Sequence, residues 1–147
     1  MSDALKLKNQ LCHRFYTVSN AFSRAYRPLL AELGITYPQY VVMMALWEED
    51  YIHIANLIDK TKVDGGAMSL ILKKLTAKGY VTVKQHDKDK RIRIVELTQK
   101  GQDAKNNAEQ IPQAMLCKFD EISTQEAQTL IELIDKLSDN LNRDSCR

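Results

Sequence analysis

Cysteine is scarce in this sequence. Its 147 residues include three, Cys12, Cys117 and Cys146, which lie far apart and belong to no CxxC pair or Cys/His cluster. A small secreted scaffold stapled by disulfides needs more cysteines, and a structural zinc site needs its ligands at close spacing. The three histidines show no ligand spacing either (His13, His53, His86). We therefore expect neither a metal site nor a cofactor.

The sequence also lacks membrane and targeting signals. No apolar run approaches the ~20 residues that span a bilayer, and the first ten residues contain no apolar segment typical of a signal peptide. We expect a cytoplasmic protein with no membrane partner. Hydrophobic residues make up 44% of the chain and charged residues 27%, as in a globular protein, and 147 residues suit a single domain over 1–147.

Charge is distributed unevenly along the chain. Residues 60–93 contain ten Lys or Arg against three Asp or Glu, a balance of +7, whereas the whole chain carries +2. Residues 102–147 carry nine acids and five bases, a balance of −4. A basic segment of this kind indicates a polyanionic partner, and double-stranded DNA fits best.

The basic segment has the layout of a winged helix-turn-helix. Residues 63–80 predict a helix with Asp64 as its N-cap and Gly79 at its end. Residues 81–86 and 91–97 alternate apolar and polar side chains on either side of a charged tip, which predicts a β-hairpin with one buried face. A helix followed by a hairpin with a basic tip is the recognition helix and wing of that fold.

Further helices flank this segment. We expect an amphipathic helix over residues 5–33 with a kink or break at Pro28, and a nearly all-apolar helix, central to the core, that starts after the N-cap Thr36. A short amphipathic helix in residues 52–60, a weakly apolar one from Gln99 through residue 119, and an amphipathic one opened by Ser123 complete the set. The fold class is therefore mainly α with a small β-hairpin. Residues 35–101 form the winged-helix DNA-binding core. Residues 1–34 and 102–147 are interpreted as dimerisation helices, which would present two recognition helices to a palindromic operator.

Residues 89–101 carry the pattern D-x-R-x-x-x-V-x-L-T-x-x-G. It resembles the wing signature of MarR-family transcriptional regulators at every defined position. Residues 11–50, LCHRFYTVSNAFSRAYRPLLAELGITYPQYVVMMALWEED, resemble the opening of the organic hydroperoxide sensors of that family, the OhrR group. The resemblance extends from about residue 7 to residue 141. It implies a winged-helix homodimer, not an enzyme, that represses transcription until an organic hydroperoxide, the inducer, oxidises it.

The resemblance also implies site residues. Cys12 falls on the peroxide-sensing cysteine, and Cys117 falls near the resolving cysteine of the two-cysteine subgroup. Tyr26 and Tyr37 fall on two tyrosines that approach the thiol from the partner subunit. Oxidation would give a sulfenic acid, then a disulfide with Cys117 of the other subunit or with a small thiol. Apart from the resemblance, an organic peroxide would need an apolar lining, which Phe15, Phe22 and Met43 or Met44 could supply, and Tyr16 lies one helical turn from Cys12.

Each of these residues also has an ordinary interpretation. Cys12 and Cys117 suit the apolar face of a helix, and Tyr26 and Tyr37 suit an interface. Cys146, next to last in the chain, is the third candidate to resolve an oxidised Cys12. At the level of function, the rivals are a repressor released by a phenolic or fatty ligand and a thiol peroxidase enzyme.

The expected DNA contacts lie on the recognition helix and the wing (Ser69, Lys73, Lys74, Lys84, Lys88, Lys90, Arg91, Arg93). The lysines could instead be a solvated helix face, and Arg91 could pair with Asp89 within the wing. Relatives often place several hydroxyl residues at the start of the recognition helix, where this chain has glycine, alanine and methionine. Ala67 or Met68 could contact thymine methyl groups there. The operator sequence and the target genes stay open.

Overall fold

A computed structural model describes residues 2–143. The chain separates into two compact units, Met1–Ile111 and Pro112–Arg147, which are treated separately below. The prediction for Cys146 falls outside the described residues. Within them, no helix is long and apolar enough to cross a membrane.

The first unit begins with two 3-10 turns, η1 (Asp3–Leu5) and η2 (Leu7–Asn9), followed by α1 (Leu11–Leu30). The sequence predicted a helix from residue 5, so its true start lies six residues later. The reason is that side chains cap the preceding backbone: Asn9 Nδ2 donates to the Asp3 carbonyl at 2.6 Å and Gln10 Nε2 to the Ala4 carbonyl at 2.5 Å. Such bonds offer the chain an alternative to the helix.

Helix α1 runs through Pro28 without a break and ends two residues later at Leu30. A turn follows and closes at Gly34, whose φ of +64° is the left-handed conformation that glycine adopts readily. Helix α2 (Tyr37–Glu48) then starts at the predicted capping box, in which Thr36 Oγ1 accepts from the Gln39 N–H and the Gln39 side chain accepts from the Thr36 N–H.

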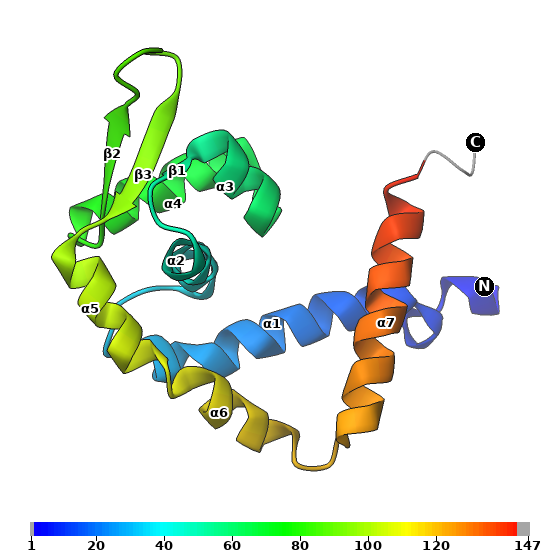
Figure 1. Ribbon diagram of the computed structural model, residues 1–147. Coiled ribbons are helices and arrows are strands. Elements are labelled where there is room, and N and C mark those ends of the chain that lie inside the picture. Colours follow the sequence, from blue (N-terminus) through cyan, green and yellow to red (C-terminus); the bar gives the residue numbers. More distant parts are fainter. Residues whose placement is uncertain (1, 144–147) are drawn as a thin grey trace. The chain divides into compact units, whose positions relative to one another are not determined.

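Helix α2 is the centre of the first unit, and it packs against α1, α3 (Ile54–Thr61), α4 (Gly65–Ala77) and α5 (Gln99–Ala108) (Figure 1). Its side chains Val42 and Leu46 are fully buried. Leu57 of α3 and Leu75 of α4 are also fully buried in the same core. Each buried aliphatic side chain of this size stabilises the fold by about 1.5–3 kcal/mol. The recognition helix is thus held by its inner face, leaving its outer face free.

The wing is a three-stranded antiparallel sheet in the order β1-β3-β2, with β1 (Ile52–His53), β2 (Val81–Gln85) and β3 (Arg93–Leu97). Val83 pairs with Val95 across the hairpin, and Ile52 pairs with Val95 from the other side. The predicted hairpin is confirmed, but residues 52–53, expected within a helix, form the third strand. In Figure 1 the hairpin loop projects beyond β1 and α2.

Helix α5 is capped by Thr98, as predicted, and it buries Ala104 and Ala108 in the core of the first unit. The helix expected to continue to residue 119 stops at Ala108. Pro112 explains the stop, because its ring would clash with the carbonyl of residue 108 and it has no N–H to donate. A separate helix α6 (Ile111–Leu116) and a 3-10 turn η3 (Cys117–Phe119) follow.

The second unit ends in α7 (Thr124–Leu141), a long helix opened by the predicted Ser123–Glu126 capping box. None of its residues is buried. Five large apolar side chains on it are exposed (Leu130, Ile131, Leu133, Ile134, Leu141). These side chains give α7 an apolar face that the rest of the second unit leaves uncovered.

Candidate functional site

The outer face of α4 carries the predicted recognition residues. Ser69, Lys73 and Lys74 are all exposed there. Met68, one of the two suggested thymine contacts, is fully buried in the core and therefore cannot reach DNA. Lys78 points away from the outer face, because its Nζ donates to the Gly34 carbonyl at 2.5 Å and to Gln39 Oε1 at 2.9 Å. It is a structural residue of the α4–α2 junction.

The wing tip is built around Asp89 and His86. Arg91 binds Asp89 in a two-pronged ion pair, Nε to Oδ1 and Nη2 to Oδ2, both at 3.2 Å. Hydrogen bonds from the Arg91 side chain and main chain hold the pKa of Asp89 below its ordinary value. His86 Nδ1 accepts from the main-chain N–H groups of Lys88 and Asp89. The wing ion pair that the sequence left as an alternative is present, and it fixes Arg91 at the tip.

Lys84 is less available to contact a phosphate than the other predicted lysines of the wing, because it is paired within the sheet. Its Nζ lies 2.8 Å from Glu96 Oε2, and the hydrogen bond to Glu96 raises the pKa of Lys84. The same nitrogen stands 5.4 Å from the centre of the Tyr51 ring. A phosphate would have to compete with Glu96 for this lysine.

Among residues 2–143, five basic side chains of the predicted interface have no carboxylate within 4.0 Å (Lys73, Lys74, Lys88, Lys90, Arg93). Two of them lie on α4 and the others on the wing. Their spacing over two elements suits the phosphates that flank a groove of DNA. Among the predicted basic contacts, these five are the ones whose charge no nearby carboxylate offsets.

Cys12 is the second residue of α1 and is exposed. The expected helix start at residue 5 would have placed it in the second turn, where the backbone N–H groups are already bonded. In the structure it lies in the first turn, where the N–H groups have no partner within the helix and negative charge is favoured. The side chains that end η2 could have signalled this position.

The first half of α1 is exposed throughout, from Leu11 to Asn20. Phe15 is 40% exposed, Tyr16 66% and Phe22 38%, so the predicted pocket residues lie along an open helix face and enclose nothing within the first unit. His13 stacks on Tyr16 with ring centres 6.4 Å apart. A second surface is needed to make this face into a pocket.

Tyr26 and Tyr37 lie together, with ring centres 4.7 Å apart. Tyr40 joins them at 5.8 Å from Tyr26, and Trp47 packs edge-on against Tyr40. Burial, followed by the neighbouring Tyr37, raises the pKa of Tyr26. Tyr26 is 14 residues after Cys12 on α1, a separation of about 21 Å at about 1.5 Å per residue. The tyrosine pair therefore cannot touch the thiol of its own chain.

Cys117 belongs to the second unit, where it opens η3 and is exposed. The structure thus gives two accessible thiols, Cys12 and Cys117, among residues 2–143. No group of three or more His, Cys, Asp or Glu in that part of the chain could hold a metal ion.

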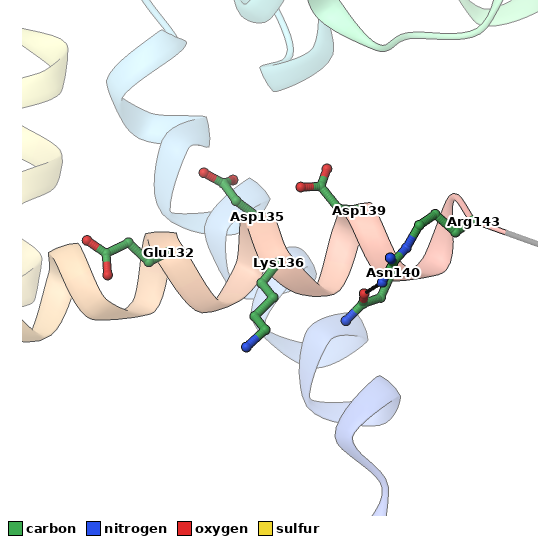
Figure 2. A pocket seen from close by; sticks show the side chains of 6 residues that line it. All are labelled: Glu132, Asp135, Lys136, Asp139, Asn140 and Arg143. Atoms are coloured by element: carbon green, nitrogen blue, oxygen red, sulfur yellow. Dashed lines mark hydrogen bonds between the residues drawn. The ribbon is translucent and has the colours of Figure 1, made fainter. Parts of the chain in front are cut away.

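A shallow hollow lies along the end of α7, and Figure 2 shows the six side chains that line it. All come from α7 or the turn just after it (Glu132, Asp135, Lys136, Asp139, Asn140, Arg143). Arg143 donates to Asn140, and the others spread into solvent in Figure 2. A hollow bounded by one helix encloses no ligand, so it is a solvated charged face.

Comparison with known proteins decides the family. The family model described as "Transcriptional regulator SarA/Rot" matches residues 24–108, which cover α2, α3, α4, the wing and α5. The chain belongs to the SarA/Rot family of MarR-like transcriptional regulators. The expected MarR-type winged-helix fold is confirmed.

The relatives of this SarA/Rot-family chain are transcriptional regulators, and some of them are named for hydroperoxide resistance or solved in reduced and disulfide forms. The "Organic hydroperoxide resistance transcriptional regulator" of Bacillus subtilis (strain 168) is 35% identical over 114 residues, covering 78% of each chain. The structure of reduced AbfR bound to DNA matches with a TM-score of 0.77 at 27% identity, covering 97% of this chain and 100% of that one. A disulfide-formed AbfR matches with a TM-score of 0.63 at 34% identity, covering 87% and 92%.

Proposed function

We propose that this regulator is a homodimeric repressor that acts in the cytoplasm, binds a palindromic DNA site, and releases it when an organic hydroperoxide oxidises Cys12. The observation that carries the proposal is the position of Cys12: an exposed thiol in the first turn of a helix whose apolar face is open. A related chain regulates resistance to organic hydroperoxides, and another has been solved both reduced on DNA and in a disulfide form.

The homodimer supplies what a single chain lacks. Helix α1 leaves Leu11, Phe15 and Val18 exposed, and α7 buries none of its residues. Covering these faces with a second copy would remove apolar surface from water at about 25 cal/mol per Å². We assign Tyr26 and Tyr37 of a twofold mate to the Cys12 thiol, because Tyr26 of the same chain lies about 21 Å away along α1. Residues 1–34 and 102–147 are the segments to which we assign dimerisation.

The redox step is a two-electron oxidation. The Cys12 thiolate attacks one peroxide oxygen, so that an S–O bond forms, the O–O bond breaks and the alcohol leaves after taking up a proton. A second thiolate, from Cys117 of the partner subunit or from a small thiol, then attacks the sulfenic sulfur. An S–S bond forms and the oxygen leaves as water. The exposed Phe15 and Phe22 would line the approach of an organic peroxide.

Helix α4 and the wing are the elements that would bind DNA and lose it on oxidation. Helix α4 would enter the major groove with Ser69, Lys73 and Lys74, and the wing would place Lys88, Lys90, Arg91 and Arg93 on the flanking backbone. Lys84 would contribute less, because Glu96 pairs with it. Two recognition helices one DNA turn apart, roughly 34–36 Å, would set the half-site spacing.

The test uses duplexes selected by the protein from a randomised DNA library. Gel shifts with and without cumene hydroperoxide, on wild type and Cys117→Ser, should show release of wild type. Non-reducing gels should show a Cys117-dependent covalent dimer. Release of Cys117→Ser only when a small thiol is added would assign the second thiol to the solvent. A wild type that stays bound after complete oxidation of Cys12, or sustained peroxide turnover without DNA binding, would overturn the proposal.

A further inference from the structure

The outer face of α4 can be defined from its buried face. Four apolar side chains anchor the helix in the core (Met68, Ile71, Leu72, Leu75). At about 100° per residue, one row of residues lies roughly 150–170° from the centre of this buried face (Gly66, Leu70, Lys73, Ala77). Ser69 and Lys74 flank the row on its two sides. This outer row is the part of α4 that reaches deepest into a groove.

Leu70 is the one large apolar side chain in the outer row, and it is 55% exposed. It breaks the apolar period of the buried face, so packing within the domain does not account for it. Lys73 and Lys74 beside it have no carboxylate within 4.0 Å. A leucine beside two lysines without ion-pair partners suits a partner surface on which anionic groups surround an apolar group.

The major groove of DNA has this character. Its edges are phosphates, and the C5-methyl group of thymine is its apolar feature. The outer row contains no Arg, Asn or Gln, so Lys73 is its one side chain of a kind that recognises guanine or adenine with two hydrogen bonds. Gly66 is not required by packing, since an added Cβ would approach only Asp64 Oδ1, at 3.4 Å. A bare backbone there lets the helix start lie close to the groove floor.

We propose that Leu70 is a specificity-determining residue that packs against a thymine methyl group in each half-site of the operator. The inference rests on the proposed function and names the base that α4 selects. Loss of one buried methyl contact corresponds to about a fourfold weaker affinity per half-site, and about fifteenfold for both half-sites of a palindrome.

The experiment replaces thymine by deoxyuridine, which removes only the methyl group. A duplex selected by the wild-type protein from a randomised library is resynthesised with each thymine replaced in turn, symmetrically in both half-sites. Affinities are measured by fluorescence anisotropy for wild type, Leu70→Ala and the control Ser69→Ala. Leu70 is exposed, so the thermal unfolding midpoint of Leu70→Ala should match wild type.

At one symmetric pair of positions, the replacement of thymine by deoxyuridine should weaken the DNA affinity of wild type and of Ser69→Ala about fifteenfold. The affinity of Leu70→Ala should change there by no more than about twofold. Equal sensitivity of Leu70→Ala at that pair would overturn the inference, as would a wild type indifferent to every replacement. A change in oligomeric state on Leu70→Ala would identify Leu70 as a protein contact and also overturn it. Failure of wild type to bind any duplex would instead overturn the proposed function, and this inference with it.

Discussion

Gly101 holds α5 against the wing, and its replacement by alanine is a stringent test of that packing. An added Cβ would lie 2.2 Å from the main-chain oxygen of Tyr80 and 3.1 Å from Leu97 Cδ2. A carbon and an oxygen normally come no closer than about 3.3 Å, so α5 must move by roughly 1 Å. The atom it meets belongs to the backbone of Tyr80, just before β2, which cannot rotate away as a side chain would.

That movement disturbs two hydrogen bonds. Trp47 Nε1 donates to the Gly101 carbonyl at 2.9 Å, and the Gly101 N–H donates to Thr98 Oγ1 at 3.1 Å. Each is worth about 1 kcal/mol, and overpacking adds about 1–3 kcal/mol. The higher helix propensity of alanine returns about 1 kcal/mol. Gly101→Ala should therefore lose about 2–4 kcal/mol of unfolding free energy.

Urea unfolding followed by the fluorescence of Trp47, the single tryptophan, measures this loss. The protein concentration is held constant, because the unfolding of any oligomer depends on concentration. The control is Gly65→Ala in the first turn of α4, where an added Cβ would meet only Ile58 Cδ1, at 3.9 Å. It should be neutral or stabilise by up to about 1 kcal/mol. A Gly101→Ala protein within ~0.5 kcal/mol of wild type would refute the packing argument.

Three further predictions concern the fold and the DNA interface. Tyr80→Phe leaves a buried main-chain carbonyl unpaired and should cost about 1–3 kcal/mol, whereas the exposed Tyr51→Phe should cost nothing measurable. Burial raises the pKa of Tyr80 above its ordinary value of 10.0, so the neutral hydroxyl stabilises the folded state fully below pH 10, and this stabilisation is lost as the pH rises through the folded-state pKa. Above pH 10 the urea midpoint of Tyr80→Phe should therefore fall less with pH than the urea midpoint of wild type. Arg93→Gln should lower the slope of log affinity against log salt by about 0.9 per lost phosphate contact, and an unchanged slope would remove Arg93 from the interface. Asp89→Asn makes the surface more positive but frees Arg91, so anisotropy titrations should show weaker DNA binding; tighter binding would mean that Asp89 only repels phosphate.

Local signals in the sequence predicted most of the fold. The caps at Thr36, Asp64, Thr98 and Ser123 all form as expected, because a cap depends on residues only three positions apart. The α4 helix and the hairpin were also predictable, since their apolar periods match their burial. Strand β1 was not, because two residues cannot show an alternation and their pairing with β3 is a tertiary contact.

The candidate site was less predictable than the fold. The 3-10 turns that place Cys12 in the first turn of α1 have only a weak local signal, the side chains of Asn9 and Gln10, whose carbonyl partners Asp3 and Ala4 lie six residues earlier. The pairing of Lys84 with Glu96 depends on the hairpin register, which places them on neighbouring strands. The role proposed for Leu70 emerges only when its exposure is compared with the buried Met68 two residues earlier. Charge and motif in the sequence located the candidate DNA-binding elements, α4 and the wing. The structure was needed to show which of their side chains are exposed and unpaired, and which are buried or paired within the domain.

The central claim is that a single thiol, Cys12, controls the DNA reader. The most direct measurement is a fluorescence anisotropy titration of the protein–DNA complex with cumene hydroperoxide, on wild type and Cys12→Ser. Wild type should release DNA with about one equivalent of peroxide per chain, and Cys12→Ser should stay bound at the same affinity as reduced wild type. Release of Cys12→Ser at the same peroxide concentration would contradict the account.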